Sequence, residues 1–254
     1  MILAVLQARV SSSRLPSKVL LPLLGKPMIL RQIERIYRSK MIDDFVLATS
    51  RDGSDDVLVD ICKKENIPVC RGSLDDVLDR FYSVVKQGEA SHIVRLTGDC
   101  PLCDPLVVDE LIKFHLSGNF DYSSNIDPPT FPDGLDVEVF RRWCLDVAWS
   151  EAVLPSEREH VTLFIRNNKN RFFCGSLEND VDLSHHRWTV DEEEDYIFVK
   201  SVYENLYFIN PGFGMNDILS FLDENPSLCI NYKIKRNEGL CRSLERDVEF
   251  KKKE

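Results

Sequence analysis

Residues 2–18 of the chain read ILAVLQARVSSSRLPSK, a short apolar segment followed by a polar and cationic one. The apolar segment, Ile2–Leu6, has the length and composition of a buried β-strand. The polar segment, residues 7–18, is rich in serine and contains three cations, Arg9, Arg14 and Lys18. A loop of this kind between a strand and a helix offers backbone N–H groups and positive charge to an anion. We expect that anion to be phosphate, although an ordinary solvated loop would have a similar composition.

Short apolar runs alternate with amphipathic stretches from this strand to about residue 120. We predict strands at Ile2–Leu6, Phe45–Ala48, Pro68–Cys70 and His92–Leu96, and helices near Met28–Lys40, Asp55–Glu65 and Asp75–Lys86 and after Pro105. Regular alternation predicts an α/β fold, in which a mainly parallel sheet is covered by helices on both faces. Ligands of such folds bind at the carboxyl ends of the strands. The loop at residues 7–18 begins at such an end.

The pattern is less regular beyond residue 120. We predict further strands at Leu135–Phe140, Phe172–Leu177 and Arg187–Val190, and helices that end near Trp149 and span Glu192–Leu206 and Asn216–Leu222. Residues 120–180 are interpreted as an arm inserted in a domain that spans residues 1–208. Residues 209–254, which contain the chain-breaking Pro211-Gly212 pair, are interpreted as a C-terminal helical extension.

The composition limits the classes of function. The 254 residues carry a formal net charge of −10, which argues against a general nucleic-acid-binding surface, because such a surface needs a basic face. No apolar run approaches the ~18 residues of a membrane span, and the N-terminus lacks the pattern of an export signal. The eight cysteines are expected to be reduced, since a chain of this length with 43% apolar residues needs no disulfides. We therefore expect a cytoplasmic protein that binds neither nucleic acid nor membranes.

Two aspartates follow predicted strands and could bind a metal ion. Asp99 lies in Thr97-Gly98-Asp99-Cys100-Pro101, and Asp191 comes directly after Arg187–Val190. A carboxylate at a strand end can bind Mg²⁺ that bridges substrate phosphates, and a neighbouring glycine lets the backbone approach a ligand closely. Together the two aspartates would form a two-carboxylate magnesium site. Alternatives remain, because Asp99 could cap a turn and Asp191 could be the N-cap of the following helix.

Other motifs have simpler explanations. The loop at residues 7–18 is not a Walker A sequence, and no Gly-x-Gly-x-x-Gly follows a strand. Cys100 and Cys103 have Cys-x-x-Cys spacing without a second pair at zinc spacing, so packing explains them better. His185 and His186 point to opposite faces of an extended segment, so they cannot easily share one metal ion. His160, at the start of an apparent helix, could meet a substrate hydroxyl or serve as a cap or core residue.

Six sequence blocks, in order, resemble the cytidylyltransferases that activate acidic sugars. This family includes CMP-Kdo synthetase and CMP-sialate synthetase, and the resemblance is strongest to its spore coat polysaccharide biosynthesis protein F branch. The blocks are Gln-Ala-Arg-x-x-Ser-x-Arg-Leu-Pro-x-Lys at 7–18, Arg-Gly-Ser at 71–73, Thr-Gly-Asp-Cys-Pro-Leu at 97–102, Phe-Pro-Asp-Gly-Leu-Asp-Val-Glu at 131–138, Glu-His-Val-Thr at 159–162 and Arg-Trp-Thr-Val-Asp at 187–191.

The resemblance implies a nucleotide-diphosphosugar-transferase fold. This fold is a Rossmann-like three-layer α/β/α sandwich with a mostly parallel sheet and a projecting arm that commonly forms a homodimer. The resemblance also implies roles for individual residues. The triphosphate loop would include Ala8, Arg9, Ser12, Arg14 and Lys18, and the magnesium aspartates would be Asp99 and Asp191. The base and ribose would lie near Arg71 and Ser73. The sugar would lie near Asn125, Glu138, His160 and Arg166.

The function implied by the resemblance is transfer of CMP from CTP to an acidic sugar of the nonulosonic type. Pyrophosphate would be released, and the product would serve surface polysaccharide or glycan biosynthesis. Mg²⁺ on the two aspartates would polarise the phosphate, while Arg9, Arg14 and Lys18 would act catalytically by neutralising the leaving pyrophosphate. Three alternatives stay open: another nucleoside triphosphate, a GT-A-type glycosyltransferase of the same architecture, and a non-catalytic nucleotide-binding protein. The glycosyltransferase would ordinarily show an Asp-x-Asp motif, which Asp99-Cys100-Pro101 does not supply.

Overall fold

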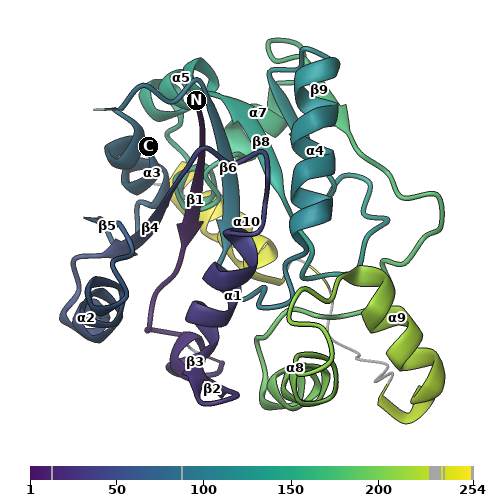
Figure 1. Ribbon diagram of the computed structural model, residues 1–254. Helices are drawn as coiled ribbons and strands as arrows, with labels where there is room; N and C mark the ends of the chain where they lie inside the picture. Colours follow the sequence, from purple (N-terminus) through teal and green to yellow (C-terminus); the bar gives the residue numbers. More distant parts are fainter. Residues whose placement is uncertain (13, 87, 229–235, 237, 253–254) are drawn as a thin grey trace.

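The computed structural model describes residues 1–12, 14–86, 88–228, 236 and 238–252. Its central sheet has the strand order β5-β4-β1-β6-β8-β7-β9, and β1, β4 and β6 run side by side through the centre of the molecule (Figure 1). β8 is antiparallel to β6 and β7, and the other pairs of this sheet are parallel. The strands are β1 (Ile2–Gln7), β4 (Asp44–Ser50), β5 (Val69–Gly72), β6 (His92–Thr97), β7 (Tyr122–Ser124), β8 (Glu138–Arg141) and β9 (Cys174–Ser176).

The central strand β1 is buried on both faces, as its continuous apolar run predicts. Alternate residues belong to different cores, because successive side chains of a strand point to opposite faces: Ala4 and Leu6 to one, Leu3 and Val5 to the other. At the carboxyl end of β1, Gln7 pairs with residues of both β4 and β6. The cationic loop therefore starts beside the ends of two other parallel strands.

Helices cover both faces of the sheet, which confirms the predicted three-layer α/β/α sandwich. α1 (Met28–Ile36), α2 (Asp56–Lys64) and α4 (Pro105–Ser117) pack on one face, and α3 (Val77–Val85), α5 (Arg142–Glu151) and α7 (Leu163–Asn167) pack on the other. In α1, for example, Ile29, Ile33 and Ile36 recur at helical spacing and are all buried against the sheet.

A third core lies beside the sandwich. It is formed by α8 (Glu193–Leu206), α9 (Met215–Glu224) and the hairpin of β2 (Pro22–Leu23) and β3 (Lys26–Pro27), around the buried Trp188. Arg35 of α1 ties this core to the sheet, because its guanidinium donates to the carbonyls of Cys103 and Phe213 at 2.8 Å each. The same group lies 4.3 Å from the centre of the Phe213 ring.

Residues Arg187–Val190 do not form the predicted strand. Their backbone groups bind two separate loops instead of one neighbouring strand: the Trp188 N–H donates to the Asp133 carbonyl at 2.6 Å, and the Val190 N–H donates to the Asp99 carbonyl at 2.8 Å. The sequence also did not indicate β7, because Tyr-Ser-Ser is too short and polar to read as a buried strand. Both differences result from long-range contacts that a local pattern does not contain.

Residues 120–180, predicted as an arm, supply β7, β8 and β9 to the sheet, and α5, α6 (Pro155–Glu159) and α7 on one side of it. His160 follows α6 and does not start a helix. The predicted extension at residues 209–254 contains α9 and α10 (Glu238–Lys251). Part of this extension lies outside the described residues, namely 229–235, 237 and 253–254, and so does Ser13 of the cationic loop. The 3₁₀ turns are η1 (Lys18–Leu20), η2 (Gly53–Asp55) and η3 (Pro226–Leu228). Within the described residues no helix is long and apolar enough to cross a membrane.

Candidate active site

The cationic loop after β1 is closed by contacts at its two ends. The Ser17 N–H donates to the Val10 carbonyl at 3.1 Å, and the Val10 N–H donates to the Asp55 carboxylate at 2.7 Å. Asp55 is fully buried and also accepts the Ser50 N–H at 3.1 Å. The loop leads into the single 3₁₀ turn η1 and not into the helix that we expected. An anion would therefore meet the loop's own cations and N–H groups and not a helix N-terminus.

Lys18 joins this loop to both predicted magnesium aspartates. Its Nζ donates to Asp191 Oδ1 at 2.8 Å and to the Val190 carbonyl at 2.7 Å, and it lies 3.5 Å from Asp99 Oδ2. Burial disfavours the charged form of Lys18, which is 9% exposed, but the carboxylates of Asp99 and Asp191 outweigh it and raise the pKa of Lys18. The ammonium group therefore remains charged between the two aspartates.

Asp191 contacts further cations from two directions. Arg14 of the loop lies 2.8 Å from Asp191 Oδ2, and Arg187 donates to the same oxygen at 3.2 Å. Three cations therefore meet one carboxylate, which makes the position of Asp191 well determined despite its place in an irregular segment.

The alternative that Asp191 caps the following helix is wrong. α8 begins at Glu193 with Glu192 as its N-cap, and the buried Asp195 accepts the N–H groups of Asp191 and Glu192 at 2.8 and 2.9 Å. Arg187 neutralises Asp195 from the side, with Nε 3.0 Å from Oδ1. Glu192 and Asp195 together thus form the start of the helix and leave the Asp191 carboxylate to face the loop.

Two glycines allow the backbone segments of the site to come together. A Cβ on Gly98 would lie 2.8 Å from the Ala8 Cβ, so this glycine permits the contact between the ends of two strands. Gly98 also lines the cavity, and its role in the approach of a ligand stays a prediction. Gly134 has a φ of +115°, and a Cβ there would lie 2.5 Å from the Trp188 carbonyl carbon. Only glycine tolerates this combination of conformation and contact. Gly134 therefore keeps residues 187–191 against the rest of the site.

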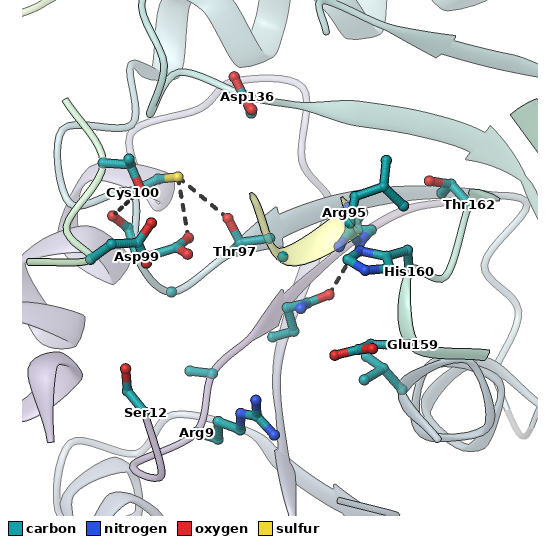
Figure 2. Close-up of a pocket in the computed structure, with 18 of the residues that line it drawn as sticks. Arg9, Ser12, Arg95, Thr97, Asp99, Cys100, Asp136, Glu159, His160 and Thr162 are labelled. Atoms are coloured by element: carbon teal, nitrogen blue, oxygen red, sulfur yellow. Dashed lines mark hydrogen bonds between the residues drawn. The ribbon is translucent and has the colours of Figure 1, made fainter. Parts of the chain in front are cut away.

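The site residues surround one cavity of about 740 Å³. Figure 2 shows Arg9 and Ser12 of the loop at one part of its wall, Asp99 and Cys100 at another, and Glu159, His160, Arg95 and Thr162 at a third. Most residues that the sequence analysis assigned to the site line this cavity, namely Ala8, Arg9, Ser12, Arg14, Lys18, Asp99, Glu138, His160, Arg166 and Asp191.

Glu138 forms an anionic centre at the end of the cavity away from the loop. It is 2% exposed, and its carboxylate accepts hydrogen bonds from Tyr122 (2.7 Å), from Thr162 and from Arg95. Burial by itself would raise the pKa of Glu138, but Arg95, Arg166 and these hydrogen bonds lower it. Glu138 is therefore ionised and holds Arg95 in place.

His160 and Arg166 lie at this same end. Burial, followed by the charge of Arg95, lowers the pKa of His160, so its ring is neutral near pH 7. The Nε of Arg166 is buried and has no hydrogen-bond partner among the described residues. An unsatisfied guanidinium donor at a cavity wall is suited to a polar or anionic ligand group.

Three predicted site residues do not reach the described cavity wall. Arg71 donates to the carbonyls of Ser50 and Asp52 at 2.8 Å each and forms an ion pair with Asp56. Ser73 lies in the turn before α3, where its hydroxyl accepts the Asp76 N–H at 3.1 Å. Asn125 is fully buried, and its amide bonds the backbone of Leu135 and Val137 at 2.8 Å each. Asn125 thus braces the loop before β8.

Further charged residues that the sequence analysis did not single out also line the cavity, among them Arg95, Asp133, Asp136 and Arg187. Burial raises the pKa of Asp136 to about 7, although Arg236 opposes this shift. Burial likewise raises the pKa of Asp133, again against the charge of Arg236. Asp133, Asp136 and Arg187 lie inside the sequence blocks that resemble the cytidylyltransferases. The resemblance therefore pointed to these segments, but the sequence analysis assigned no role to these three residues.

The cysteine pair is explained by packing. Cys100 and Cys103 are both buried free thiols, and burial raises the pKa of Cys103 to about 12. Burial and the charge of Asp99 also raise the pKa of Cys100. Protonated thiols are poor metal ligands, and the described residues contain no group of three or more His, Cys, Asp or Glu side chains that could hold a metal ion.

The donor set at Asp99 and Asp191 suits Mg²⁺ bound with its substrate. Mg²⁺ is commonly held by one or two carboxylates together with substrate phosphates and water. In the described structure the Lys18 ammonium supplies the positive charge that these carboxylates share. The two aspartates would therefore hold Mg²⁺ chiefly when a polyphosphate completes its ligands.

The chain is similar to known proteins over most of its length. The cytidylyltransferase family model matches residues 3–209. The spore coat polysaccharide biosynthesis protein SpsF of Bacillus subtilis (strain 168) is 34% identical over 232 residues, covering 89% of this chain and 95% of that protein. A cytidylyltransferase structure from Leptospira borgpetersenii has a TM-score of 0.86 at 33% identity and covers 92% of this chain and 99% of that one. A 3-deoxy-manno-octulosonate cytidylyltransferase of Chloroherpeton thalassium is 32% identical over 109 residues, 42% of this chain and 43% of that protein.

Proposed function

Because the chain belongs to the cytidylyltransferase family and is a nucleotidyltransferase, we propose that it transfers CMP from CTP to an acidic sugar and releases pyrophosphate. One observation carries the proposal. The Lys18 ammonium lies 2.8 Å from Asp191 and 3.5 Å from Asp99. A cationic loop and two carboxylates from distant parts of the chain thus meet at one end of the cavity, as the binding of a metal-bound triphosphate requires.

In the proposed reaction a sugar hydroxyl attacks the α-phosphorus of CTP in line. The bond from that phosphorus to the pyrophosphate oxygen breaks, its electron pair leaves on pyrophosphate, and the hydroxyl proton passes to solvent. Arg9, Arg14 and Lys18 line the cavity beside the aspartates and would stabilise the negative charge that develops on the leaving pyrophosphate. Mg²⁺ on Asp99 and Asp191, when bound, would neutralise phosphate charge.

The sugar would occupy the end of the cavity at Glu138, His160 and Arg166. Arg95 and Arg166 bring positive charge to that end, and the buried Nε of Arg166 lacks a partner within the described residues. A carboxylate on the sugar would satisfy such a group. The similarity to a 3-deoxy-manno-octulosonate cytidylyltransferase supports an acidic acceptor, and the similarity to SpsF supports a role in polysaccharide biosynthesis.

The test measures pyrophosphate release with Mg²⁺, each of CTP, UTP, GTP and ATP, and sialic, legionaminic and pseudaminic acids. We expect release with CTP and at least one acidic sugar. A glycosyltransferase would release no pyrophosphate from any of these mixtures. A non-catalytic nucleotide-binding protein would bind CTP in a calorimeter and still release none, so either outcome would overturn the proposal.

A further inference from the structure

The C-terminal helix α10 (yellow in Figure 1) forms part of the cavity wall, although it lies outside the segment 3–209 that the family model matches. Gly239, Leu240, Arg242 and Arg246 of this helix line the cavity. The helix therefore adds to a site whose other parts come from the family segment, at the end where the sugar is proposed to bind.

Polar contacts hold α10 in this position. Ser243 and Asp247, one helical turn apart, are its buried side chains, and the other side chains described on α10 are partly or fully exposed. The Asp247 carboxylate accepts the N–H of Ser156 at 2.9 Å and its hydroxyl at 2.6 Å, at the start of α6. A carboxylate at a helix N-terminus is a favourable pairing. This contact determines where α10 lies against α6.

Ser243 connects the helix to His160. Its hydroxyl donates to the Glu159 carboxylate at 2.6 Å, and its oxygen lies 3.0 Å from His160 Nε2. The hydroxyl can donate to Glu159 or to the Gly239 carbonyl at 3.0 Å. With its proton on either acceptor, the oxygen accepts the N–H of Nε2, which leaves Nδ1 as the basic nitrogen of the neutral ring. Arg246 donates to the same serine oxygen at 2.9 Å and pairs with Glu159. The helix thus determines both the orientation and the tautomer of His160.

The charges that this segment adds to the cavity are all positive. Among the described residues beyond 209, the charged side chains of the cavity wall are those of Arg236, Arg242 and Arg246. The chain as a whole carries a net charge of −10. Arg236 forms ion pairs with Asp133 and Asp136, and Arg246 forms one with Glu159. Arg242 brings a further positive charge to this wall, and a cation there favours an anionic ligand.

We propose that α10 selects the sugar substrate: Arg242 binds the carboxylate of the acidic sugar, and Ser243 is a positioning residue that orients His160 toward it. This inference rests on the proposed function, since it assigns part of the acceptor site of that reaction. It predicts that the acceptor specificity of this enzyme depends on a helix outside the segment that matches the family.

The first test replaces Arg242 by Gln in the full-length chain. Lys251→Gln is the matched control, because it removes the same charge from an exposed position of α10 outside the cavity wall. With an active acidic sugar, we expect Arg242→Gln to raise the sugar KM about tenfold to a hundredfold and to leave the CTP KM unchanged. With the methyl ester of the same sugar, whose carboxyl group carries no charge, Arg242→Gln should change the sugar KM little.

The second test replaces Ser243 by Ala. We expect a lower kcat/KM for the sugar, an unchanged CTP KM, and a change in the ¹⁵N signals of the His160 ring, because the Nε2–H loses its acceptor. A merely structural serine would lower thermal stability without changing these ring signals. Arg242→Gln, at an exposed position, keeps the inference testable if Ser243→Ala does not fold.

The outcomes separate the two proposals. If the wild-type protein releases pyrophosphate and Arg242→Gln has the wild-type sugar KM, the role of α10 is refuted and the proposed function stands. Equal effects of Arg242→Gln and Lys251→Gln would also refute it. If the wild-type protein releases no pyrophosphate with any acidic sugar, the proposed function fails and the inference fails with it.

Discussion

Replacing Lys18 by Met removes the charge at the point where the loop and both aspartates meet, while it keeps a side chain of similar length. The Lys18 ammonium contacts the Val190 carbonyl at 2.7 Å, Asp191 at 2.8 Å and Asp99 at 3.5 Å. Lys18 is 9% exposed, so its ammonium is preorganised. One such donor at developing charge contributes roughly a 10²- to 10³-fold increase in rate, or about 3–4 kcal/mol of transition-state stabilisation. We therefore expect kcat to fall by that factor. Asp191 keeps its contacts to Arg14 and Arg187, so the fold should persist.

The assay is steady-state pyrophosphate release at saturating CTP and sugar, with thermal denaturation to verify folding. Lys26→Met is the matched control, since Lys26 is an exposed lysine of the small hairpin. Lys18→Arg should not restore the rate, because a planar guanidinium does not fit where a compact ammonium lies between two carboxylates. A folded Lys18→Met protein with a kcat within about threefold of wild type would refute the catalytic role of Lys18.

Three further perturbations test how the site is supported. Gly134→Ala should cost about 1–3 kcal/mol or more of unfolding free energy and reduce activity, because of its φ of +115° and its contact with Trp188. Gly53→Ala is the control and should change little, since no atom lies within 4 Å of a new Cβ there. Equal urea midpoints for the two variants would contradict this prediction. Asp55→Asn should cost about 1.5–3 kcal/mol and raise the CTP KM, because the amide keeps one of the two oxygens that accept the Val10 and Ser50 N–H groups and replaces the other by a donor. An unchanged KM would contradict the anchoring role. Burial lowers the pKa of His115 to about 3. Between about pH 6.5 and pH 3 the unfolded chain therefore binds a proton at His115 that the native chain does not bind. The free energy of unfolding should fall with falling pH in this range, by at most about 1.4 kcal/mol per pH unit. Urea unfolding across that range should show a smaller slope for His115→Asn, and an identical slope would contradict the assignment.

Much of the fold could be predicted from local pattern. The continuous apolar run Ile2–Leu6 is a central strand, and the amphipathic stretches after it form helices on both faces of the sheet. These elements have strong periodic signals that tertiary contacts reinforce. The resemblance to the cytidylyltransferases is confirmed by the family model and by relatives that span most of the chain.

The parts of the fold and of the site that the sequence did not predict depend on contacts between distant residues. Arg187–Val190 has a strand-like composition, yet its N–H groups bind Asp133 and Asp99 on different loops. The link from Ser243 to His160 spans 83 residues, and a sequence pattern contains no sign of it. Asp55, read as the start of a helix, is the buried anchor of the cationic loop. Roles of this kind are set by packing and hydrogen bonds, which local spacing does not reveal.

The fate of the CTP phosphates tests the central claim most directly. CTP labelled with ³²P at the α-position or at the γ-position is incubated with Mg²⁺ and an acidic sugar, and the products are separated. Attack at the α-phosphorus predicts that the α-label enters a CMP-sugar, while the γ-label appears only in pyrophosphate. Transfer of the γ-label to the sugar, or no labelled sugar with either substrate, would contradict the account.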